Sequence, residues 1–203
     1  MSDSLVVIPT YNEIENIESI TEAVMALTPG FDLLIVDDGS PDGTASSVRS
    51  LQQRFPGRIH LMERKEKSGL GTAYIAGFKW ALERPYDYIL EMDADFSHPP
   101  AKLVELRGSC EKDEADVVVG SRYVRGGGVV NWPLIRLLLS RGASLYVRLI
   151  TGMKVMDPTA GFVCYKRKVL EVIGLDAIRF VGYAFQIEMK YRSFRKGFRI
   201  REI

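Results

Sequence analysis

Short, continuously apolar segments alternate with amphipathic segments over the first 120 residues of this chain. The apolar segments are rich in β-branched residues and occupy residues 5–8, 33–36, 59–62, 86–92 and 117–119. Because their apolar residues do not alternate with polar ones, we expect strands that are buried on both faces of a sheet. Helices are predicted between these strands, at residues 14–27, 40–55, 72–82 and 100–109. This alternation with short connections predicts an α/β fold with a doubly wound, mostly parallel sheet.

After residue 120 the pattern becomes less regular. A glycine-rich stretch at residues 125–131 precedes a predicted helix at residues 133–150. A last helix at residues 183–196 leads into a short strand at residues 198–203. The chain has 203 residues, which is the length of one domain, so we expect a single domain.

The charge balance and the cysteine count exclude several classes of protein. Twenty-seven Lys and Arg side chains stand against 26 Asp and Glu, a net charge of +1, which argues against a nucleic-acid partner. Cys110 and Cys164 are far apart and lack metal-binding spacing, so we expect neither a disulfide framework nor a zinc site. The chain has no secretory signal and no apolar run near the roughly 18 residues of a membrane span, which predicts a cytoplasmic protein.

Polar residues follow three of the first four predicted strands, at residues 9–13, 37–44 and 93–95. The carboxyl ends of parallel strands meet at one edge of a sheet, where such folds bind their ligands. Helix capping is the simplest role for Asn12, Ser40 and Asp42, and Ser40 followed by Pro41 has the residue types of a helix N-terminus. Capping does not explain the third group.

That third group contains Asp93 and Asp95, whose side chains should point to the same side because residues alternate along a strand. Two carboxylates held close together repel each other unless a cation relieves them. Mg²⁺ is usually held by one or two carboxylates and leaves positions open for phosphate oxygens. Arg122 follows the fifth strand on the same side. These residues predict a metal-assisted site for a nucleoside diphosphate.

The glycine-rich loop at residues 68–72, with the sequence SGLGT, differs from a dinucleotide-binding fingerprint. Tyr74 stands where the third glycine is needed, and the loop follows the third strand instead of the first. We interpret Gly69 and Gly71 as a tight turn at which the backbone approaches another group at the start of a helix. A hydride-transferring oxidoreductase is therefore discarded.

Residues 117–156 contain basic residues but no Asp or Glu. The predicted helix at residues 133–150 carries Arg136 and Arg141 beside an apolar stripe of leucines. This pattern fits a helix at an anionic membrane surface and equally a core helix with solvated arginines, so both interpretations stay open. Arg148 is assigned to a solvated face.

Six motifs together resemble the polyprenol-phosphate mannosyltransferases of glycosyltransferase family 2. They are PTYNE at residues 9–13, DDGSPDGT at 37–44, GLGTAY at 69–74, MDAD at 92–95, GSRY at 120–123 and FQ at 185–186. The resemblance covers the whole chain and implies the GT-A fold, which is a Rossmann-like doubly wound sheet. It also implies metal-dependent, inverting transfer of mannose from GDP-mannose to a polyprenyl (dolichyl-type) monophosphate, with Mg²⁺ or Mn²⁺ as cofactor.

The resemblance also implies roles for individual positions. The donor-binding residues would be Pro9, Tyr11, Glu13, Val36, Asp38, Asp93, Ala94, Asp95 and Arg122. The metal pair would be Asp93 and Asp95, which with Arg122 form the catalytic set, and Arg122 with Arg136 would contact the acceptor phosphate.

By the same resemblance, residues 1–120 form the nucleotide-sugar half of one catalytic domain, residues 1–203, and residues 121–203 the acceptor half. The family continues past such a last strand with further basic donor contacts, so we expect the acceptor half to be cut short. The family also implies a peripheral protein at the cytoplasmic face of the membrane.

The acceptor determines which catalytic groups are needed. A phosphate monoester has a second pKa near ~6, so it is mostly a dianion at neutral pH and already a nucleophile. We expect a single displacement at the anomeric carbon through an oxocarbenium-like transition state, with no carboxylate base. Asp157 and Glu188, near where relatives keep a base, are therefore predicted not to titrate in catalysis.

Two other functions stay open at this point. One is a polyprenyl-phosphate glucosyltransferase or aminosugar transferase that uses a UDP-sugar. The other is a non-catalytic relative that binds a nucleotide or a lipid; the intact acidic pair argues against it, since nothing else would hold repelling carboxylates together.

Overall fold

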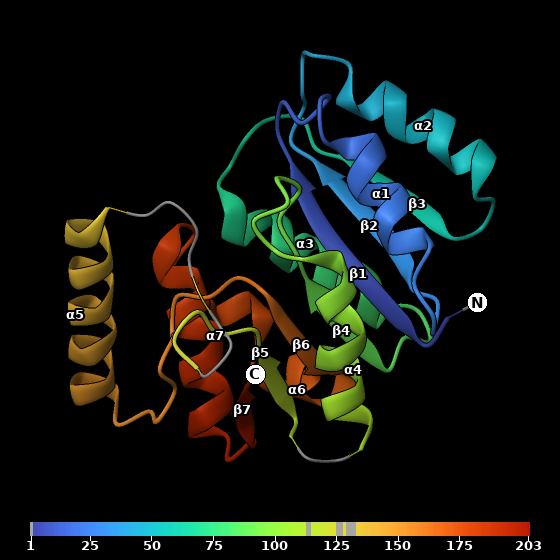
Figure 1. The fold of residues 1–203 in the computed structure, drawn as a ribbon. Coiled ribbons are helices and arrows are strands. Elements are labelled where there is room, and N and C mark those ends of the chain that lie inside the picture. Colours follow the sequence, from blue (N-terminus) through green and yellow to red (C-terminus); the bar gives the residue numbers. More distant parts are fainter. Residues whose placement is uncertain (1, 113–114, 125–127, 129–132) are drawn as a thin grey trace.

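The computed structural model describes residues 2–112, 115–124, 128 and 133–203, with the main chain alone at 134 and 136 (Figure 1). Within these residues the chain forms one seven-stranded sheet in the order β3-β2-β1-β4-β6-β5-β7. The strands are β1 (Ser4–Thr10), β2 (Asp32–Asp37), β3 (Ile59–Glu63), β4 (Tyr88–Glu91), β5 (Val117–Val119), β6 (Val163–Lys166) and β7 (Ile200–Glu202).

The sheet is mostly parallel, as the sequence predicts. β1 pairs in parallel with both β2 and β4, β2 with β3, and β5 with β7. β6 runs antiparallel to β4 and β5, because the chain leaves β5 and re-enters β6 at the same edge, where the Gly120 amide donates to the Phe162 carbonyl. The strand order reverses between β1 and β4, which is the place where doubly wound sheets bind ligands.

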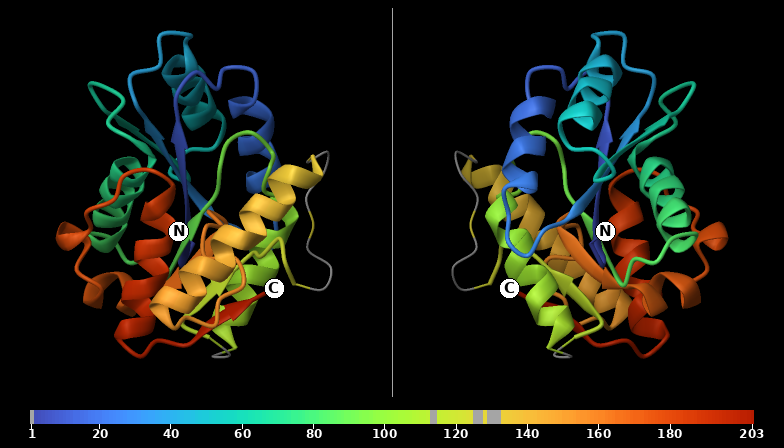
Figure 2. Two further views of the ribbon diagram at one scale, coloured as in Figure 1. Left: turned by 90° about the vertical axis from the view of Figure 1, so that its left-hand side faces the viewer. Right: turned by 90° about the vertical axis from the view of Figure 1, so that its right-hand side faces the viewer.

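Helices cover both faces of the sheet (Figures 1 and 2). On one face the apolar residues of α1, α2 and α4 pack together, and on the other face those of α3, α6 and α7. The helices are α1 (Ile17–Met25), α2 (Thr44–Arg54), α3 (Leu70–Leu82), α4 (Leu103–Glu111), α5 (Leu134–Thr151), α6 (Arg167–Val172) and α7 (Tyr183–Arg195), with 3-10 turns η1 (Pro100–Lys102) and η2 (Leu175–Ala177).

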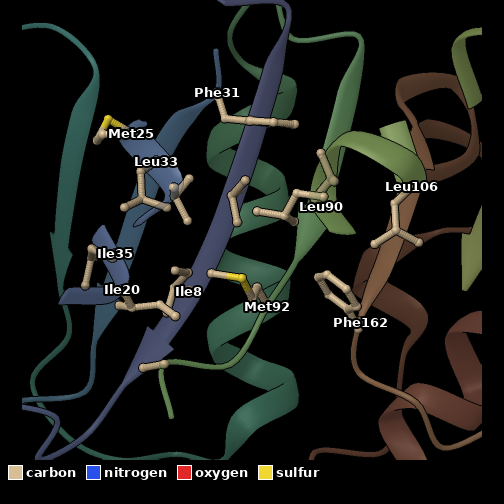
Figure 3. Packing of buried hydrophobic residues seen from close by; sticks show 14 of the residues in the cluster. Ile8, Ile20, Met25, Phe31, Leu33, Ile35, Leu90, Met92, Leu106 and Phe162 are labelled. Carbon is tan, nitrogen blue, oxygen red and sulfur yellow. The ribbon is translucent and has the colours of Figure 1, made fainter. Parts of the chain in front are cut away.

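Successive residues of a central strand point to opposite faces of the sheet and pack in different clusters. In β1, Val6 and Ile8 pack on the α1 side, whereas Leu5 and Val7 pack on the α3 side. Figure 3 shows the first cluster, in which residues of the central strands meet Ile20 of α1. Because helices cover both faces of the sheet, side chains that point to either face are buried and most positions of the central strands are apolar, which explains the continuous apolar segments in the sequence.

One predicted helix start is wrong. α2 begins at Thr44 and its N-cap is Gly43, with φ +97°, so Ser40 is not the cap. The Ser40 hydroxyl instead donates to Asp37, while the Asp42 carboxylate accepts the Thr44 amide and thereby satisfies the first turn. A left-handed residue at the junction suits glycine, which is why the start moves past Ser40.

Other predicted boundaries also shift, and two short elements were not predicted. α1 begins only at Ile17, with Asn16 as its N-cap, so Asn12 does not cap it. β4 is limited to Tyr88–Glu91, shorter than the predicted strand at residues 86–92. The two unpredicted elements are α6 and η2. Both are too short to show the periodic spacing of apolar residues by which a helix is recognised in a sequence.

α5 lies at the rim of the molecule, away from the sheet (Figures 1 and 2). It exposes large apolar side chains instead of burying them, and these are Ile135, Leu138, Leu139, Leu145, Tyr146, Leu149 and Ile150. In the part of the chain that the structure describes, none of the helices has the length and apolarity needed to cross a membrane. The glycine-rich stretch at residues 125–131 lies outside the described residues, apart from Gly128.

Candidate functional site

A cavity of about 640 Å³ opens at the carboxyl ends of β1, β2 and β4. It therefore occupies the position expected at the reversal of strand order. Its walls come from the three strand ends, from the loop after β3, and from the first residues of α3 and α7. The lining residues are Pro9, Thr10, Tyr11, Glu13, Asp38, Lys67, Leu70, Ala73, Asp93, Ala94, Asp95, Gly182 and Tyr183.

Asp93 and Asp95 both line this cavity, although β4 ends before them at Glu91. A turn after the strand, and not strand alternation, therefore places the two carboxylates together. The Tyr74 hydroxyl donates to Asp93 Oδ1 at 3.2 Å, and the Ser97 amide donates to Asp95 Oδ1 at 2.9 Å. Burial raises the pKa of Asp93, and the charge of Asp95 adds to this, while His98 opposes it.

The acidic pair fits a divalent cation. A cation in the cavity would stabilise the ionised form of Asp93, which burial and the charge of Asp95 disfavour. No group of three or more His, Cys, Asp or Glu side chains among the described residues is arranged to hold a metal ion. A cation bound by Asp93 and Asp95 would therefore keep most of its coordination positions for ligand oxygens and water. Mg²⁺ is bound in this way in nucleotide-dependent enzymes.

The end of β2 carries two aspartates with different roles. Asp37 is buried and accepts hydrogen bonds from Thr10 Oγ1 at 2.9 Å and from the hydroxyl of Ser40 at 2.6 Å, so it holds the strand ends together. Asp38 faces the cavity, and its Oδ1 lies 3.1 Å from Arg64 Nη1. Burial raises the pKa of Asp38, whereas the charge of Arg64 opposes the shift. Asp38 is thus a preoriented acceptor at the wall.

Lys67 also lines the cavity, although it is not among the residues predicted from the sequence. Its ammonium lies 4.2 Å from the centroid of the Tyr11 ring, and both residues line the cavity. A signal was available, because Lys67 follows the third strand in the same way as the acidic groups follow the other strands. Tyr183, which is almost fully exposed at the start of α7, was also not selected.

Arg122 lines a second cavity, of about 300 Å³, together with Ser97 and His98. Residues 93–98, the segment that carries the acidic pair, thus contribute to the walls of both cavities. The guanidinium of Arg122 forms a bidentate pair with fully buried Asp157, at 2.7 Å from Nε and 2.6 Å from Nη2, and Nη2 also donates to Thr159 Oγ1. Such paired charged hydrogen bonds fix the plane of the guanidinium.

Asp157 and Glu188 are both engaged by cations. Burial raises the pKa of Asp157, but the hydrogen bonds and charge of Arg122 outweigh this and lower it below the ordinary value. The pKa of Glu188 is also lowered, because hydrogen bonds from the Arg179 and Phe180 amides and from Arg192 outweigh its burial. Both carboxylates are therefore ionised at neutral pH and already hold partners.

One predicted donor-binding position, Val36, is not among the residues that line either cavity. Val36 is fully buried in β2 and packs in the core on the α3 side. Arg136 belongs to α5, but its side chain lies outside the described residues. The role of each as a ligand contact stays a prediction.

A buried polar network behind the acidic pair was not predicted. Glu91, the last residue of β4, accepts a hydrogen bond from Gln186 Nε2 at 2.6 Å. Lys190 Nζ, one turn further along α7, donates to Gln186 Oε1 and to the Ala160 carbonyl at 2.6 Å. Glu91 and Lys190 are both fully buried. The network joins β4, α7 and the loop after Asp157, which are three elements that bound the two cavities.

The close backbone approach expected at Gly69 and Gly71 is made to α7. A Cβ at Gly71 would lie 2.8 Å from the Phe185 ring, and the Gly71 amide donates to the Val181 carbonyl. Gly69 has φ +100°, a conformation that side chains rarely adopt. The two glycines let the starts of α3 and α7 meet at the cavity wall.

Comparison with known proteins identifies the family of this chain. The profile of the glycosyl transferase family 2 matches residues 5–174. Over 200 residues the chain is 47% identical to the polyprenol monophosphomannose synthase of Mycolicibacterium smegmatis, which covers 98% of this chain and 75% of that protein. It is 46% identical to the undecaprenyl-phosphate mannosyltransferase of Micrococcus luteus, over 98% of this chain and 81% of that protein.

Solved structures share the fold at lower sequence identity. A glucosyl-3-phosphoglycerate synthase from Mycobacterium tuberculosis, solved with Mn²⁺, UDP and phosphoglyceric acid, superposes with a TM-score of 0.70 at 22% identity and covers 98% of this chain and 67% of that chain. A mannosyltransferase from Pyrobaculum calidifontis, solved with GDP-Man and Mn²⁺, gives a TM-score of 0.63 at 18% identity, over 99% of this chain and 54% of that chain.

Proposed function

The chain belongs to glycosyltransferase family 2 and to its polyprenol-phosphate mannosyltransferases, and on this premise we propose that it transfers mannose from GDP-mannose to a polyprenyl monophosphate, with inversion. One observation carries the proposal. The 640 Å³ cavity brings together seven of the nine expected donor-binding residues from three strand ends. They are Pro9, Tyr11, Glu13, Asp38, Asp93, Ala94 and Asp95.

In this proposal the diphosphate of the donor lies beside Asp93 and Asp95. A bound Mg²⁺ or Mn²⁺ supplies stabilisation of the negative charge that forms on the leaving diphosphate. The Tyr74 hydroxyl and the Ser97 amide hold the two carboxylates in place. Lys67 adds a positive charge to the same cavity beside Tyr11, whose ring would contact the nucleoside. The Pyrobaculum enzyme, which shares the fold, was solved with GDP-Man and Mn²⁺, and this supports a GDP-sugar and a divalent cation as ligands.

The acceptor phosphate lies, in this proposal, in the 300 Å³ cavity against the guanidinium of Arg122. Asp157 and Thr159 fix that guanidinium before the acceptor arrives, so little ordering is needed on binding. The phosphate is already a dianion near neutral pH. It therefore attacks the sugar without losing a proton to Asp157 or Glu188, which are occupied by Arg122 and Arg192.

The lipid acceptor requires a membrane, and α5 offers a surface for it. Its exposed apolar side chains share one side of the helix, where residues such as Leu138 and Leu149 are about two thirds or more exposed. A helix of this kind lies in the interfacial plane with its apolar side among the acyl chains. The protein is proposed to bind the cytoplasmic face of the membrane peripherally through α5.

Transfer of labelled mannose tests the proposed reaction directly. The full chain is incubated with Mn²⁺ or Mg²⁺, a short-chain polyprenyl phosphate, and either labelled GDP-mannose or labelled UDP-glucose. We expect a mannosylated lipid phosphate from GDP-mannose only, and loss of the product when the cation is chelated. Transfer from UDP-glucose alone would favour the glucosyltransferase, and no transfer from either donor would favour a non-catalytic relative.

A further inference from the structure

α5 carries a second, polar feature on a face of the helix that borders its exposed apolar residues. A pocket of about 310 Å³ lies between this helix, the segment after β5 and the segment before Asp157. We call it the α5 pocket, and its lining residues are Tyr123, Arg141, Ser144, Leu145, Arg148 and Met156. Four of them follow the i, i+3, i+4, i+7 spacing that places side chains on one face of a helix.

The charge in the α5 pocket is positive and is not neutralised by the protein. Among the described residues, no carboxylate forms an ion pair with Arg141 or Arg148, and residues 117–156 contain no Asp or Glu. The Arg148 Nε is buried and has no hydrogen-bond partner, although Arg148 as a whole is half-buried. The Arg141 guanidinium lies 5.8 Å from the centroid of the Tyr123 ring. An unsatisfied buried donor of this kind costs free energy until an acceptor binds.

The pocket is continuous with the apolar side of α5. Leu145 lines the pocket and is also more than half exposed, next to Tyr146 and Leu149. A ligand that occupies both places needs an anionic group for the two arginines and an apolar chain for the exposed leucines. A phospholipid with its phosphate at the pocket and its acyl chains along the helix meets both needs.

We propose that the α5 pocket binds the phosphate of an anionic bilayer phospholipid and so fixes how α5 sits at the membrane. This inference rests on the proposed membrane association of α5. Charge complementarity selects the occupant, because two guanidinium groups seven residues apart face a site without acids. The pocket is separate from the Arg122 cavity, since the two share no lining residue, so it is not assigned to the reacting acceptor phosphate. Arg148, which the sequence pattern assigns to a solvated face, thereby becomes a ligand-binding residue.

Vesicle binding of the full chain tests the proposal. Vesicles are made of phosphatidylcholine alone or of phosphatidylcholine mixed with phosphatidylglycerol, and bound protein is measured by co-sedimentation. We expect tighter binding to the mixed vesicles, and a loss of about tenfold for the double variant Arg141→Gln, Arg148→Gln on those vesicles only. The matched control is Arg195→Gln, Lys196→Gln, which removes two exposed charges at the end of α7 and should bind as the wild type does.

Arg148→Lys separates a specific site from general attraction to a charged surface. Lysine keeps the positive charge but has no donor at the Nε position. We expect the Arg148→Lys variant to bind the mixed vesicles about threefold or more weakly than the wild type. Wild-type binding by Arg148→Lys, or equal losses in the double variant and its control, would overturn the proposed site. Circular dichroism of each variant checks that the fold is intact.

A second readout distinguishes this proposal from the proposed reaction. Mannose transfer to a short-chain polyprenyl phosphate in solution, without vesicles, should have unchanged kcat and KM in the Arg141, Arg148 double variant. A raised KM in this assay would assign the pocket to the substrate phosphate and would also overturn the proposal. Absence of transfer in the wild type would refute the proposed function alone, because vesicle binding is measured independently of it.

Discussion

At the scale of single residues, the site depends on how the protein fixes charged groups before any ligand binds. Asp93 is held by Tyr74, and Arg122 is held by Asp157 and Thr159. Preorganised charges of this kind stabilise a transition state without further reorganisation. The sequence indicated Asp93, Asp95 and Arg122 as candidates because strand ends are recognisable, and their roles stay predictions. It did not predict that Arg122 would be held by Asp157, since residues 35 positions apart give no local signal.

Glu188→Gln tests whether a carboxylate base is used. We expect kcat to change by less than about tenfold, because a phosphate dianion needs no base and Glu188 already pairs with Arg192 at 2.8 Å. The pH profile of kcat/KM should keep its shape. Steady-state mannose transfer in the full chain is the measurement, with Asp176→Asn, an exposed aspartate that lines neither cavity, as control. A loss of about 10²–10⁴, the size of a general-base effect, contradicts the account.

At the scale of elements, β4 and α7 are joined by charges that are removed from water. Burial raises the pKa of Glu91, and burial lowers the pKa of Lys190, while the charge of each partner opposes the shift of the other. Gln186 bridges the two groups. The sequence offered Phe185 and Gln186 as a motif but no reason for the motif. The structure supplies it, because Gln186 links the strand of the acidic pair to the helix that closes the cavity.

Lys190→Met should therefore destabilise the fold strongly. It leaves Glu91 buried without its cation, and breaking a buried pair in this way costs about 3–5 kcal/mol. The double variant Glu91→Gln, Lys190→Met should lose less than the sum of the two single variants, since neither charge then remains buried. Urea denaturation at neutral pH measures these free energies of unfolding. Additive losses in the double variant would show that the two side chains are not coupled.

Asp116 connects the edge strand β7 to the rest of the sheet, and its titration makes stability depend on pH. Burial raises the pKa of Asp116, but hydrogen bonds from Lys168 and Arg199 outweigh this effect and lower the pKa to about 2. A carboxyl with a lowered folded-state pKa stabilises the fold above the unfolded value near ~4 and loses this contribution as the pH falls toward 2. Because Lys168 and Arg199 are half exposed, we expect Asp116 to contribute about 1 kcal/mol to the free energy of unfolding.

Asp116→Asn should thus flatten the acid limb of the stability curve. Urea denaturation between pH 5 and pH 2.5 is expected to show a smaller decrease for the variant than for the wild type, with equal slopes above pH 6. Asp176→Asn, whose side chain is 88% exposed, serves as the control. If the variant and the wild type lose stability in parallel, Asp116 is not the group that titrates.

At the scale of the whole molecule, the sequence predicted the layered α/β fold and the edge of the sheet at which the 640 Å³ cavity lies. Both depend on local patterns, namely apolar strands and the polar residues that follow them. The antiparallel direction of β6 depends instead on where the chain returns after α5, which no local pattern encodes. For the same reason the sequence left the environment of α5 open, and only the structure shows its leucines exposed.

The central claim is that one divalent cation at Asp93 and Asp95 binds the diphosphate of a GDP-sugar at the carboxyl end of β4. The most direct measurement is the anomalous scattering of Mn²⁺ in crystals of the full chain grown with GDP-mannose. We predict a manganese peak within coordination distance of both carboxylates and of the diphosphate oxygens, and its disappearance in Asp95→Asn. A manganese ion bound elsewhere, or a diphosphate bound away from these two carboxylates, would contradict the account.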